Sequence, residues 1–594
     1  MSTHDDTGGT HNRGTPCVVL REEMDARWLR FDSPVRVLST DRPEQVLPLL
    51  REIDDAVRRE DLHAAGFVSY EAAPGCDPAL PAKPDGAFPR LWFGLFRDVR
   101  EGNALPAATA REPALSWQAD TPPEEYDRCF NAVRDRIRDG STYQVNYSFR
   151  LRAPAPDADP WATFLALVGD DPPPGAAFVD TGDWAVCSAS PEMFFRLDGD
   201  RIESRPMKGT AERGLWFEDD LCRALRLAAS PKDRAENVMI VDMVRSDLGR
   251  IARPGTVRVS SLLEVEKHAT VWQMTSTVCA ETEVGLDGLF AALFPPASVT
   301  GAPKRRTMEI IAALERSPRR VYTGAIGCLS PPRRARFNVA IRTVLFDRRG
   351  GRAEYGVGGG IVWDSTAGGE RRECDAKTRV LRPRRRVFDL LETLLWSPSR
   401  GYVLLREHLR RLGQSADRFS FDLDLLQAQA ELERLAAALP PLPHRVRLLA
   451  ARSGALRSEA AVLGPEAARF ADLPLAQEPV DASDVFLYHK TTARAAYEAA
   501  LRGRPGHADV LLFNARGEVT ESTVANVAVE IDGGFFTPPV ACGLLPGTCR
   551  AWLLATGVLR ERAIAVSDLP RARRVCLFNA VRGLHEVRVL REGK

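Results

Sequence analysis

The segment SPKDRAENVMIVDMVRSDLGRI, residues 230–251, combines helix-start signals with acidic side chains at helical spacing. Ser230 is a favourable N-cap and Pro231 fits the first turn, so we predict a helix over residues 231–249. Asp233 and Glu236 lie three residues apart in that helix and therefore share one face. This face is either an ion-paired surface or one wall of a cation site.

A second acidic segment, GGERRECDAK at residues 368–377, repeats this pattern. If it is helical, Glu370, Glu373 and Lys377 share one face. Two facing pairs of carboxylates suit a hard cation with oxygen ligands, most simply Mg²⁺ holding an anionic substrate. From the spacing alone, we favour the alternative interpretation that these acids pair with Arg234, Arg371 and Arg372 on a wet surface.

The chain around these segments alternates helices with short β-branched strands, which predicts an α+β or α/β fold. A polar N-terminal stretch and the basic run RPRRR divide the sequence into a disordered tail at 1–16, a first domain at 17–381, a linker at 382–386 and a second domain at 387–594. The first domain has an N-terminal part at 17–115 and a core at 120–381. The elements that we expect in it are helices at 43–59, 124–139, 217–229, 231–249, 286–294 and 303–316, and strands at 17–20, 67–70, 91–96 and 337–345.

Composition narrows the possible classes of protein. The formal net charge of +1 over 594 residues argues against general electrostatic capture of nucleic acid or of an anionic membrane. No apolar run reaches the roughly 18 residues of a membrane span, and the polar N-terminus lacks a secretory signal, so a reducing cytoplasm is the simplest compartment. Only 8 of the 81 basic residues are Lys, which makes each lysine a residue to inspect.

Glycine-rich loops lie near both acidic segments. PPASVTGAPK (295–304) leads into a predicted helix, and GVGGGIVWDS (356–365) precedes the second acidic face. Backbone N–H groups in such loops bind carboxylates or phosphates, although either loop could be an ordinary turn. Arg342 stands at the end of the strand predicted at 337–345, where a guanidinium could clamp a carboxylate with two hydrogen bonds.

Together with SASPE (188–192), RPMKGT (205–210), YTGAIG (322–327) and NVAIRT (338–343), these segments resemble the chorismate-utilising enzymes. That family includes anthranilate synthase, isochorismate synthase and aminodeoxychorismate synthase component I. The resemblance covers residues 120–381, and residues 17–100 fit the N-terminal part of the last-named group. It implies a chorismate-utilising-enzyme α+β sandwich.

The resemblance also implies roles for individual residues. Glu236 and Glu373 match the direct Mg²⁺ ligands of the family, and Asp233 and Glu370 match its outer acids. Glu192 matches the acid that assists loss of the C4 hydroxyl of chorismate. The substrate-binding set that it implies is Gln144, Thr300, Gly301, Tyr322, Arg342, Gly358, Gly359, Gly360 and Lys377.

Three positions discriminate between activities within the family. Gln144 replaces the water-activating Lys of isochorismate-type enzymes, and Gln cannot act as that base. Lys208 matches the Lys of aminodeoxychorismate synthases that is inferred to attack C2 of chorismate, although Lys208 could instead be a carboxylate-binding cation. Gln273 replaces the His that serves pyruvate loss in anthranilate synthases, which fits a first domain that stops before that step; nearby His268 could substitute.

The second domain has one internal lysine, Lys490, after the strand-like run VFLYH at 485–489. A pyridoxal phosphate enzyme needs one Lys for a covalent bond to its cofactor and an acid against the pyridine nitrogen, for which Glu521 is available. Gly547 and Thr548, before a predicted helix at 550–556, could cradle a phosphate. On this evidence alone, Lys490 could also be an ordinary surface residue.

The motifs FDLLET (388–393), REHLRRL (406–412), YHKTTAR (488–494), GEVTESTVANV (517–527) and GLLPGTCR (543–550) resemble the class IV aminotransferases of fold type IV, which have two subdomains. The resemblance implies that Lys490 bonds the cofactor, that Glu521 pairs with its pyridine nitrogen, and that its phosphate is bound by Arg411, Gly547 and Thr548. These motifs do not separate transaminases from 4-amino-4-deoxychorismate lyase. The fusion favours the lyase, because a lyase would consume the product of the first domain.

The resemblances together imply a bifunctional folate-pathway enzyme that makes 4-aminobenzoate from chorismate with Mg²⁺ and pyridoxal phosphate. The sequence contains no glutamine-amidotransferase motif, so we expect a separate subunit of that kind to supply ammonia. The second domain could form a homodimer. Two alternatives stay open: an anthranilate-type synthase fused to a class IV transaminase, and a synthase whose C-terminal part is a non-catalytic docking module.

Overall fold

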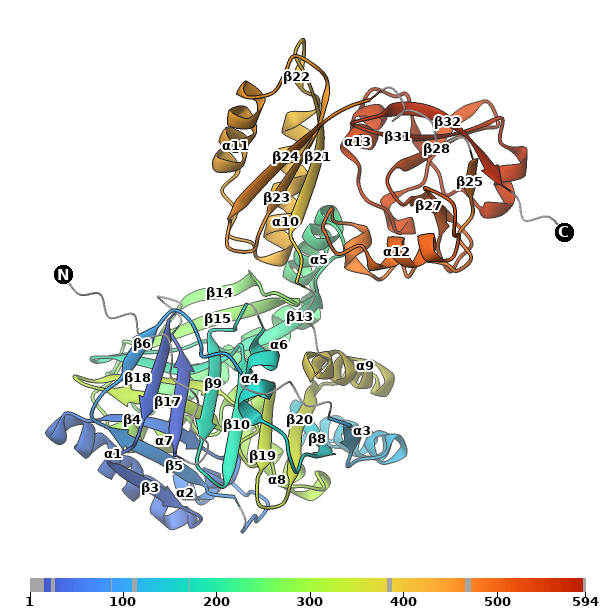
Figure 1. The fold of residues 1–594 in the computed structure, drawn as a ribbon. Helices are drawn as coiled ribbons and strands as arrows, with labels where there is room; N and C mark the ends of the chain where they lie inside the picture. Colours follow the sequence, from blue (N-terminus) through green and yellow to red (C-terminus); the bar gives the residue numbers. More distant parts are fainter. Residues whose placement is uncertain are drawn as a thin grey trace, which may run out of the picture. The chain divides into compact units, whose positions relative to one another are not determined.

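The computed structural model divides the chain into two compact units (Figure 1). The first unit comprises Met1–Ala211 and Leu225–Arg385, and the second comprises Glu212–Ala224 and Arg386–Lys594. The residues that the structure describes are 15–22, 27–86, 88–108, 115–169, 171–381, 387–464 and 472–590. Most of the predicted tail (residues 1–14) and the whole predicted linker (382–386) lie outside them.

The first unit is built on two ten-stranded sheets. In one, the strand order is β16 (Gly301–Ala302), β8 (Gln144–Pro154), β20 (Arg352–Ile361), β19 (Thr343–Asp347), β10 (Trp184–Ser190), β9 (Gly175–Asp180), β1 (Cys17–Arg21), β2 (Trp28–Asp32) and β6 (Arg100–Gly102), with β7 (Gln118–Ala119) on β8. In the other, it is β13 (Met207–Glu212), β15 (Val271–Glu281), β12 (Arg201–Ser204), β11 (Met193–Asp198), β18 (Arg334–Val339), β17 (Ala325–Ser330), β4 (His63–Val68), β5 (Leu91–Phe96) and β3 (Arg36–Thr40), with β14 (Arg258–Lys267) on β15.

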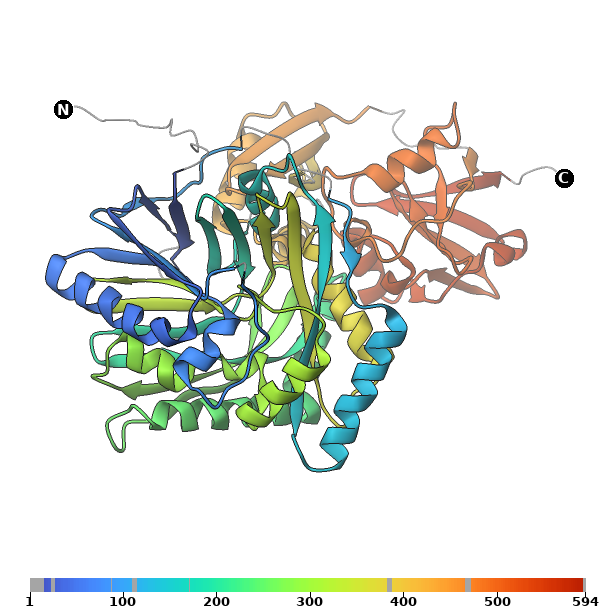
Figure 2. The same cartoon turned by 90° about the horizontal axis from the view of Figure 1, so that it is seen from below.

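The two sheets face each other across a shared apolar core. Val18, Val179 and Val186 of one sheet pack with Phe67 and Ile326 of the other. Helices cover the outer faces, because each sheet still has a second apolar face to bury; α1 is the long blue helix along one side in Figure 2. These helices are α1 (Val46–Glu60), α2 (Ala73–Cys76), α3 (Pro123–Arg138), α4 (Pro160–Val168), α6 (Pro231–Gly249), α7 (Leu286–Leu293), α8 (Lys304–Leu314) and α9 (Ala367–Thr378). The predicted α+β sandwich is confirmed.

The helix predicted at 231–249 is present with those bounds as α6, and Ser230 caps it by accepting a hydrogen bond from Asp233 N. The single strand predicted at 337–345 is wrong. The chain leaves one sheet at Val339, the end of β18, and enters the other at Thr343, the start of β19. Arg342 lies in the connecting turn with φ +50°, so it is a turn residue and not a strand residue.

The second unit contains two further sheets, each with its own apolar core. The four-stranded sheet has the order β22 (Gly401–Tyr402), β21 (Leu390–Ser397), β23 (His444–Ala450) and β24 (Leu456–Val462), and carries α10 (Leu405–Phe419) and α11 (Leu425–Ala437). The eight-stranded sheet has the order β25 (Asp472–Pro474), β32 (Gly583–Leu590), β31 (Arg574–Asn579), β28 (Asn526–Ile531), β27 (Val519–Ser522) and β26 (Leu511–Phe513), with β29 (Gly534–Thr537) and β30 (Arg560–Glu561). Two further α-helices of this unit are α12 (Ala495–Arg502) and α13 (Thr548–Ala555). Two sheets with two cores agree with the two subdomains that we predicted.

The run before Lys490 is not the predicted strand. Residues Val485–Leu487 form a 3₁₀ helix, capped by Asp484, whose side chain accepts a hydrogen bond from Phe486 N. The strand-like composition gave a wrong prediction here. In the described sheets this segment pairs with no strand, and its residues Leu487 and Tyr488 pack in an apolar core instead.

Residues 212–224 group with the second unit, although the sequence analysis assigned them to the first domain. They contain the first half of α5 (Phe217–Ala229). Within the second unit, the ring of Trp216 stacks on Tyr488 with centroids 5.3 Å apart. Arg213 and Asp220 form a buried ion pair at 2.6 Å, which holds the segment in a compact turn. Sequence periodicity predicted the helix but not the unit to which its start belongs.

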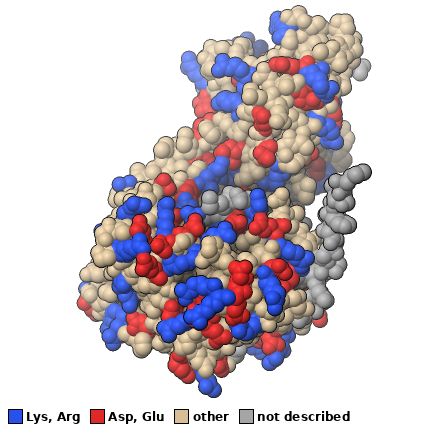
Figure 3. All heavy atoms as spheres, turned by 90° about the vertical axis from the view of Figure 1, so that its left-hand side faces the viewer, with Lys and Arg blue, Asp and Glu red and all other residues tan. Residues whose placement is uncertain are grey.

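On the face drawn in Figure 3, Lys and Arg side chains alternate with Asp and Glu and form no large patch of one sign. No helix among the described residues combines the length and apolar character that crossing a bilayer requires.

Candidate active sites

The first candidate site surrounds Lys208, on β13 of the first unit. A Cβ added to Gly360 of β20 would lie 3.1 Å from Lys208 Nζ and 2.2 Å from Gln144 Nε2. Both side chains therefore reach the glycine strand, and the absence of a side chain at residue 360 makes room for them. Burial lowers the pKa of Lys208, and the carboxylates of Glu236 and Glu192 oppose that shift.

The four predicted acids approach this lysine from two helices. Glu236 and Asp233 lie on α6, and a Cβ at Gly209, next to Lys208, would stand 2.9 Å from Asp233 Cβ. Glu370 and Glu373 lie on α9, which confirms the helical geometry predicted for them. A Cβ at Gly359 would stand 2.7 Å from Glu370 Oε2. The structure thus brings both acidic faces to the neighbourhood of β13 and β20.

The electrostatics of these acids fit a cation. Burial raises the pKa of Glu236 and of Glu370, and each also feels another carboxylate nearby. Glu370 Oε1 accepts a hydrogen bond from Ser365 Oγ at 2.7 Å, while its buried Oε2 has no hydrogen-bond partner among the described residues. Within the described ranges, no three His, Cys, Asp or Glu side chains converge as a ready-made metal cluster. Carboxylate oxygens are ligands that Mg²⁺ prefers, and this ion usually keeps water and substrate oxygens as further ligands, so the four acids fit an Mg²⁺ site.

Lys377 is held by the second acidic face. Its Nζ pairs with Glu373 Oε1 at 2.7 Å and donates to the carbonyl oxygen of Gly358 at 2.8 Å. Burial alone would raise the pKa of Glu373, but Lys377 outweighs it and lowers that pKa. Lys377 therefore links α9 to the glycine strand and balances part of the acidic charge.

Glu192 follows β10 and is almost completely buried. Burial raises its pKa to about 7, against the opposing effects of a hydrogen bond from Ser298 and of the positive charge of Lys208. A carboxyl group with such a pKa can hold a proton near neutral pH and donate it, which is what general acid catalysis requires.

Tyr322 lies in a slot between β20 and a buried arginine. A Cβ at Gly356 would stand 2.2 Å from the Tyr322 ring, so the ring lies flat against the glycine backbone. On the neighbouring strand, Arg150 pairs in register with Gly356, and its guanidinium lies 4.9 Å from the centre of the Tyr322 ring. This packing fixes the ring that the sequence assigned to substrate binding.

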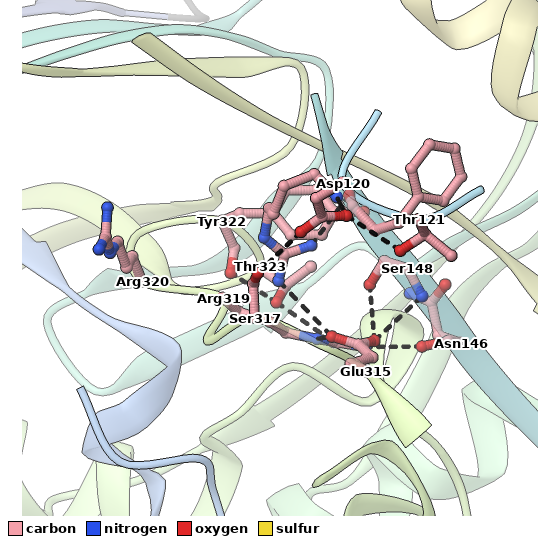
Figure 4. A network of polar contacts seen from close by, with 12 residues as sticks. Asp120, Thr121, Asn146, Ser148, Glu315, Ser317, Arg319, Arg320, Tyr322 and Thr323 are labelled. Carbon is pink, nitrogen blue, oxygen red and sulfur yellow. Dashed lines mark hydrogen bonds and ion pairs between the residues drawn. The ribbon is translucent and has the colours of Figure 1, made fainter. Parts of the chain in front are cut away.

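A buried ionic network supports this slot (Figure 4). Glu315 accepts hydrogen bonds from Arg319 Nη2 at 2.5 Å and from Ser148 N and Oγ at 3.0 and 2.8 Å. It also pairs with Arg150 at 3.5 Å. Arg150, Arg319 and Glu315 were missed by the sequence analysis. Glu315 and Arg319 stand in the charged run ERSPRR (315–320) and Arg150 stands in SFRLR (148–152), and neither segment reveals the pairing.

Thr300, Gly301 and Arg342 were also predicted to bind substrate, and each has a different environment. Thr300 is fully buried, and its hydroxyl donates to the carbonyl oxygens of Pro296 and Ala297, both at 3.2 Å. Gly301 has φ +143°, and a Cβ there would stand 2.1 Å from the Gln144 carbonyl oxygen. Burial lowers the pKa of Arg342. The loop at 295–304 thus serves close backbone packing, and the Thr300 hydroxyl stabilises the loop itself.

Gln273 supports the strand that carries Lys208. Its Nε2 donates to the carbonyl oxygen of Gly209 at 2.7 Å, and its Oε1 accepts from Thr210 Oγ1 at 2.9 Å. An amide satisfied in this way positions β13 and has no capacity to remove a proton.

The second candidate site lies in the second unit around Lys490 and Glu521. Burial and the nearby Arg411 lower the pKa of Lys490 to about 8, so a useful fraction of it is the neutral amine near neutral pH. Burial raises the pKa of Glu521 to about 7. Glu521 accepts hydrogen bonds from Tyr497 Oη at 2.8 Å and from Asn526 Nδ2 at 3.1 Å. A buried carboxyl with fixed donors and a nucleophilic lysine fit the needs of pyridoxal phosphate.

The predicted phosphate residues lie on α10 and at the start of α13. Gly547 is the N-cap of α13, and a Cβ there would stand 1.9 Å from Asn526 Oδ1, so only glycine fits. Arg411 donates to Glu392 at 2.7 and 2.9 Å and to the carbonyl oxygen of Pro546 at 3.3 Å. A helix N-terminus beside a buried guanidinium suits a phosphate group. His408 and Glu392, which the sequence analysis did not select, complete this cluster.

Two family models match the chain. Residues 15–383 match the model described as chorismate binding enzyme, and residues 389–590 match the model described as amino-transferase class IV.

Curated relatives named aminodeoxychorismate synthase are similar to part of the chain. The chain is 39% identical over 386 residues to aminodeoxychorismate synthase component 1 of Escherichia coli (strain K12), covering 59% of this chain and 84% of that protein. It is 42% identical over 290 residues to aminodeoxychorismate synthase of Streptomyces griseus, covering 47% of this chain and only 40% of that protein. The chain therefore spans less than half the length of the Streptomyces relative.

Among solved structures, the chain is similar to anthranilate synthase component I from Streptococcus pneumoniae TIGR4, with a TM-score of 0.50 and 24% sequence identity. The match covers 64% of this chain and 95% of that chain. At this level of identity the likeness concerns the fold alone.

Proposed function

Because the chain belongs to the chorismate binding enzyme family, we propose that its first unit aminates chorismate to 4-amino-4-deoxychorismate and that its second unit converts this product to 4-aminobenzoate and pyruvate. The observation that carries the proposal is the environment of Lys208, a half-buried side chain whose pKa is lowered by its partial burial, among Glu236, Glu192 and Glu373. An amine in that state can act as a nucleophile towards an anionic ring.

In the first unit, Glu236 and Glu373 would hold Mg²⁺, with Asp233 and Glu370 behind them; the ion would supply positive charge for a substrate carboxylate. Tyr322 and Arg342 would bind and orient the substrate. The remaining predicted groups around it are Gln144, Thr300, Gly301, Gly358, Gly359, Gly360 and Lys377.

The amination would proceed by two displacements. The Lys208 amine forms a bond to C2 of chorismate, the ring double bonds shift, and the C4 hydroxyl leaves as water with the proton that Glu192 holds. Ammonia then bonds to C4, the double bonds shift back, and Lys208 leaves C2. Glu192 regains a proton as the added nitrogen loses one, so the site returns to its starting state.

In the second unit, Lys490 would bond pyridoxal phosphate, with Glu521 at its pyridine nitrogen and Arg411, Gly547 and Thr548 at its phosphate. The cofactor, when bound, supplies an electron sink. Once the amine of the substrate has displaced Lys490 from the cofactor, the freed Lys490 would take the proton from C4 of the substrate; the enolpyruvyl group leaves from C3, takes up a proton and becomes pyruvate, and the ring becomes aromatic. The lowered pKa of Lys490 supports this role, because only the neutral amine accepts a proton.

Two partners belong to this proposal. A separate glutamine amidotransferase subunit would supply ammonia, consistent with the component 1 name of the Escherichia coli relative. A second copy of the chain could pair through the second unit. The product would serve folate biosynthesis.

The test is product analysis by mass spectrometry after incubation of the full chain with chorismate, Mg²⁺, ammonium and pyridoxal phosphate. We expect 4-aminobenzoate and pyruvate in equal amounts. Accumulation of 4-amino-4-deoxychorismate alone would refute the proposal for the second unit, and anthranilate would refute the proposal for the first. No observation in the described structure favours the anthranilate alternative, since Gln273 is occupied in holding β13.

A further inference from the structure

The second unit includes a short stretch that the sequence places far from the rest of it. Residues Arg213–Trp216, which we call the docking segment, belong to this unit, although they begin only five positions after Lys208. In the structure the docking segment lies against Tyr488 and His489, the two residues that precede Lys490. One stretch of chain thus adjoins the first proposed nucleophile in the sequence and the second in space.

The docking segment is held by the start of α5. Asp220 Oδ1 accepts a hydrogen bond from Gly214 N at 2.6 Å, and Asp220 Oδ2 accepts one from Arg213 Nη2 at 2.6 Å. Asp219 Oδ2 accepts a hydrogen bond from Leu215 N at 3.0 Å. A Cβ at Gly214 would stand 2.1 Å from Asp220 N, so only glycine allows this close turn. Because the two carboxylates take the N–H groups, the carbonyl oxygens of Gly214 and Leu215 need partners elsewhere.

These partners come from the rest of the second unit. Arg418 Nε donates to the carbonyl oxygen of Gly214 at 2.9 Å. His489 Nε2 lies 3.1 Å from the carbonyl oxygen of Leu215, which can only accept, so Nε2 carries the proton. Burial and Arg418 lower the pKa of His489 to about 3, so its Nδ1 is bare and accepts a hydrogen bond from Ser415 Oγ at 2.9 Å. His489 is therefore a neutral link of fixed tautomer between α10 and the docking segment.

Apolar contacts complete the docking. The Trp216 ring stacks on Tyr488 with centroids 5.3 Å apart and 22° between the planes. Leu215 and Trp216 are half-buried and pack against an apolar core that contains Tyr488 and Tyr497. Tyr497 also donates to Glu521 at 2.8 Å. The docking segment thus fills one side of a core that supports Glu521 as well.

The backbone before Lys490 depends on these contacts. Residues Val485–Leu487 form a 3₁₀ helix that pairs with no strand in the described sheets. The side chains of Tyr488 and His489, which follow, are both fixed on the docking segment. On the opposite side, the carbonyl oxygen of Lys490 accepts a hydrogen bond from Leu391 N at 3.0 Å. Lys490 is therefore held from β21 and from the docking segment together.

We propose that the docking segment is a positioning element for Lys490, which acts through Tyr488 and His489 so that the amine reaches the aldehyde of pyridoxal phosphate. The inference deepens the proposed function of the second unit and rests on it. It follows that residues 387–594 alone lack part of the core of this unit, because Leu215 and Trp216 come from the sequence assigned to the first domain.

The experiment compares two ligands that differ in their demand on Lys490. With pyridoxal phosphate, the amine of Lys490 adds to the aldehyde carbon, and the aldehyde oxygen leaves as water. Pyridoxamine phosphate carries an amine in place of the aldehyde and binds without that bond. Both are titrated into the full chain by calorimetry. In Trp216→Ala, we expect the affinity for pyridoxal phosphate to fall about two- to tenfold, as for a lost aromatic pair, and the affinity for pyridoxamine phosphate to stay unchanged.

Three further variants complete the design. Trp216→Phe keeps a ring on Tyr488 and should restore most of the affinity for pyridoxal phosphate. Phe217→Ala is the matched control: Phe217 is the next residue but is 40% exposed, so this variant should bind both ligands as the wild type does. Should Trp216→Ala not fold, Arg418→Met provides a second route, because it removes the hydrogen bond to Gly214 and should weaken binding of pyridoxal phosphate alone.

The outcomes separate the two levels of the proposal. If the wild-type chain binds neither ligand, the proposed function of the second unit falls and the inference falls with it. If the wild type binds both, but Trp216→Ala weakens both equally or neither, only the inference is overturned, because a general loss of stability does not discriminate between the ligands. The rate at which the absorbance band of covalently bound cofactor grows gives an independent readout. It should be lower in Trp216→Ala and unchanged in Phe217→Ala.

Discussion

Lys208 and Lys490 are both half-buried lysines with lowered pKa values, but the balance of their neighbours differs. Around Lys208, the carboxylates of Glu236, Glu192 and Glu373 oppose the shift that burial causes, and Lys377 adds to it. Around Lys490, Arg411 and Arg494 add to the effect of burial and outweigh the carboxylates of Glu392 and Glu521, and the pKa falls to about 8. The protein alone therefore favours the neutral amine form of Lys490. The fraction of Lys208 that is neutral depends more on the cation that neutralises the acids around it, which in the proposed mechanism is Mg²⁺.

The largest effect is expected from Lys490→Ala. Without the amine, the second unit should lose the absorbance band of covalently bound cofactor, and 4-aminobenzoate formation should fall by more than about a thousandfold. The first site is untouched, so 4-amino-4-deoxychorismate should accumulate. Lys490→Arg is the matched control: it keeps the positive charge but stays protonated, and we expect no rescue. Unchanged 4-aminobenzoate formation in either variant would remove Lys490 from the mechanism.

Lys208→Ala tests the other side of the comparison. Amination of chorismate should fall by more than about a thousandfold, while supplied 4-amino-4-deoxychorismate is still converted to 4-aminobenzoate. The variant Lys208→Arg distinguishes between two roles of Lys208, as a nucleophile and as a positive charge that binds a carboxylate. If Lys208 only binds a carboxylate, the arginine variant keeps much of the amination rate; if Lys208 bonds C2, both variants are inactive.

Removal of divalent cations should slow only the reaction at Lys208, the lysine that is surrounded by acids. Treatment with a chelator should abolish amination and leave conversion of 4-amino-4-deoxychorismate unchanged. Glu236→Gln should raise the Mg²⁺ concentration needed for half-maximal amination by about ten- to a hundredfold. Equal sensitivity of both half-reactions to the chelator would contradict the assignment of the metal to the first unit.

The pH dependence of the first half-reaction should include the titration of Glu192, because burial raises its pKa to about 7. Glu192 acts as a general acid only while protonated, and Lys208 attacks only as the neutral amine, so the pH profile of amination should be bell-shaped. The rate must be divided by the concentration of free ammonia, which itself rises with pH. Glu192→Gln should be slow and should lose the limb of the profile that belongs to Glu192, and a wild-type profile with a single limb after this correction would contradict the role.

Local sequence signals predicted local structure well and long-range pairing poorly. The cap at Ser230 and the helical spacing of the acids located α6 and α9. The turn at Arg342 was missed because strand composition continues while the chain changes sheets. The network of Arg150 and Glu315 joins residues far apart in the sequence, and no spacing rule connects them.

The same limit explains His408 in the second unit. His408 lies inside the motif REHLRRL, three positions before Arg411. Its hydrogen-bond partners are Glu392 on β21 and Thr548, which follows 140 residues later in the chain. Lysine scarcity directed attention to Lys208 and Lys490, the two lysines that we propose as amine nucleophiles, a role that a guanidinium cannot take because it stays protonated.

The smallest effect that we predict concerns the slot of Tyr322. In Gly356→Ala, the new Cβ would stand 2.2 Å from the Tyr322 ring, so the ring must move. Overpacking of this kind should lower the free energy of unfolding by about 1–3 kcal/mol, and displacement of the ring should raise the KM for chorismate. Gly102→Ala, on β6 of the same sheet, is the control because its nearest neighbour would be 3.9 Å away. Thermal unfolding and steady-state kinetics of both variants check this. An unchanged KM in Gly356→Ala would show that Tyr322 does not contact the substrate, whereas a raised KM together with normal turnover of 4-amino-4-deoxychorismate would confine the effect to the site of Lys208.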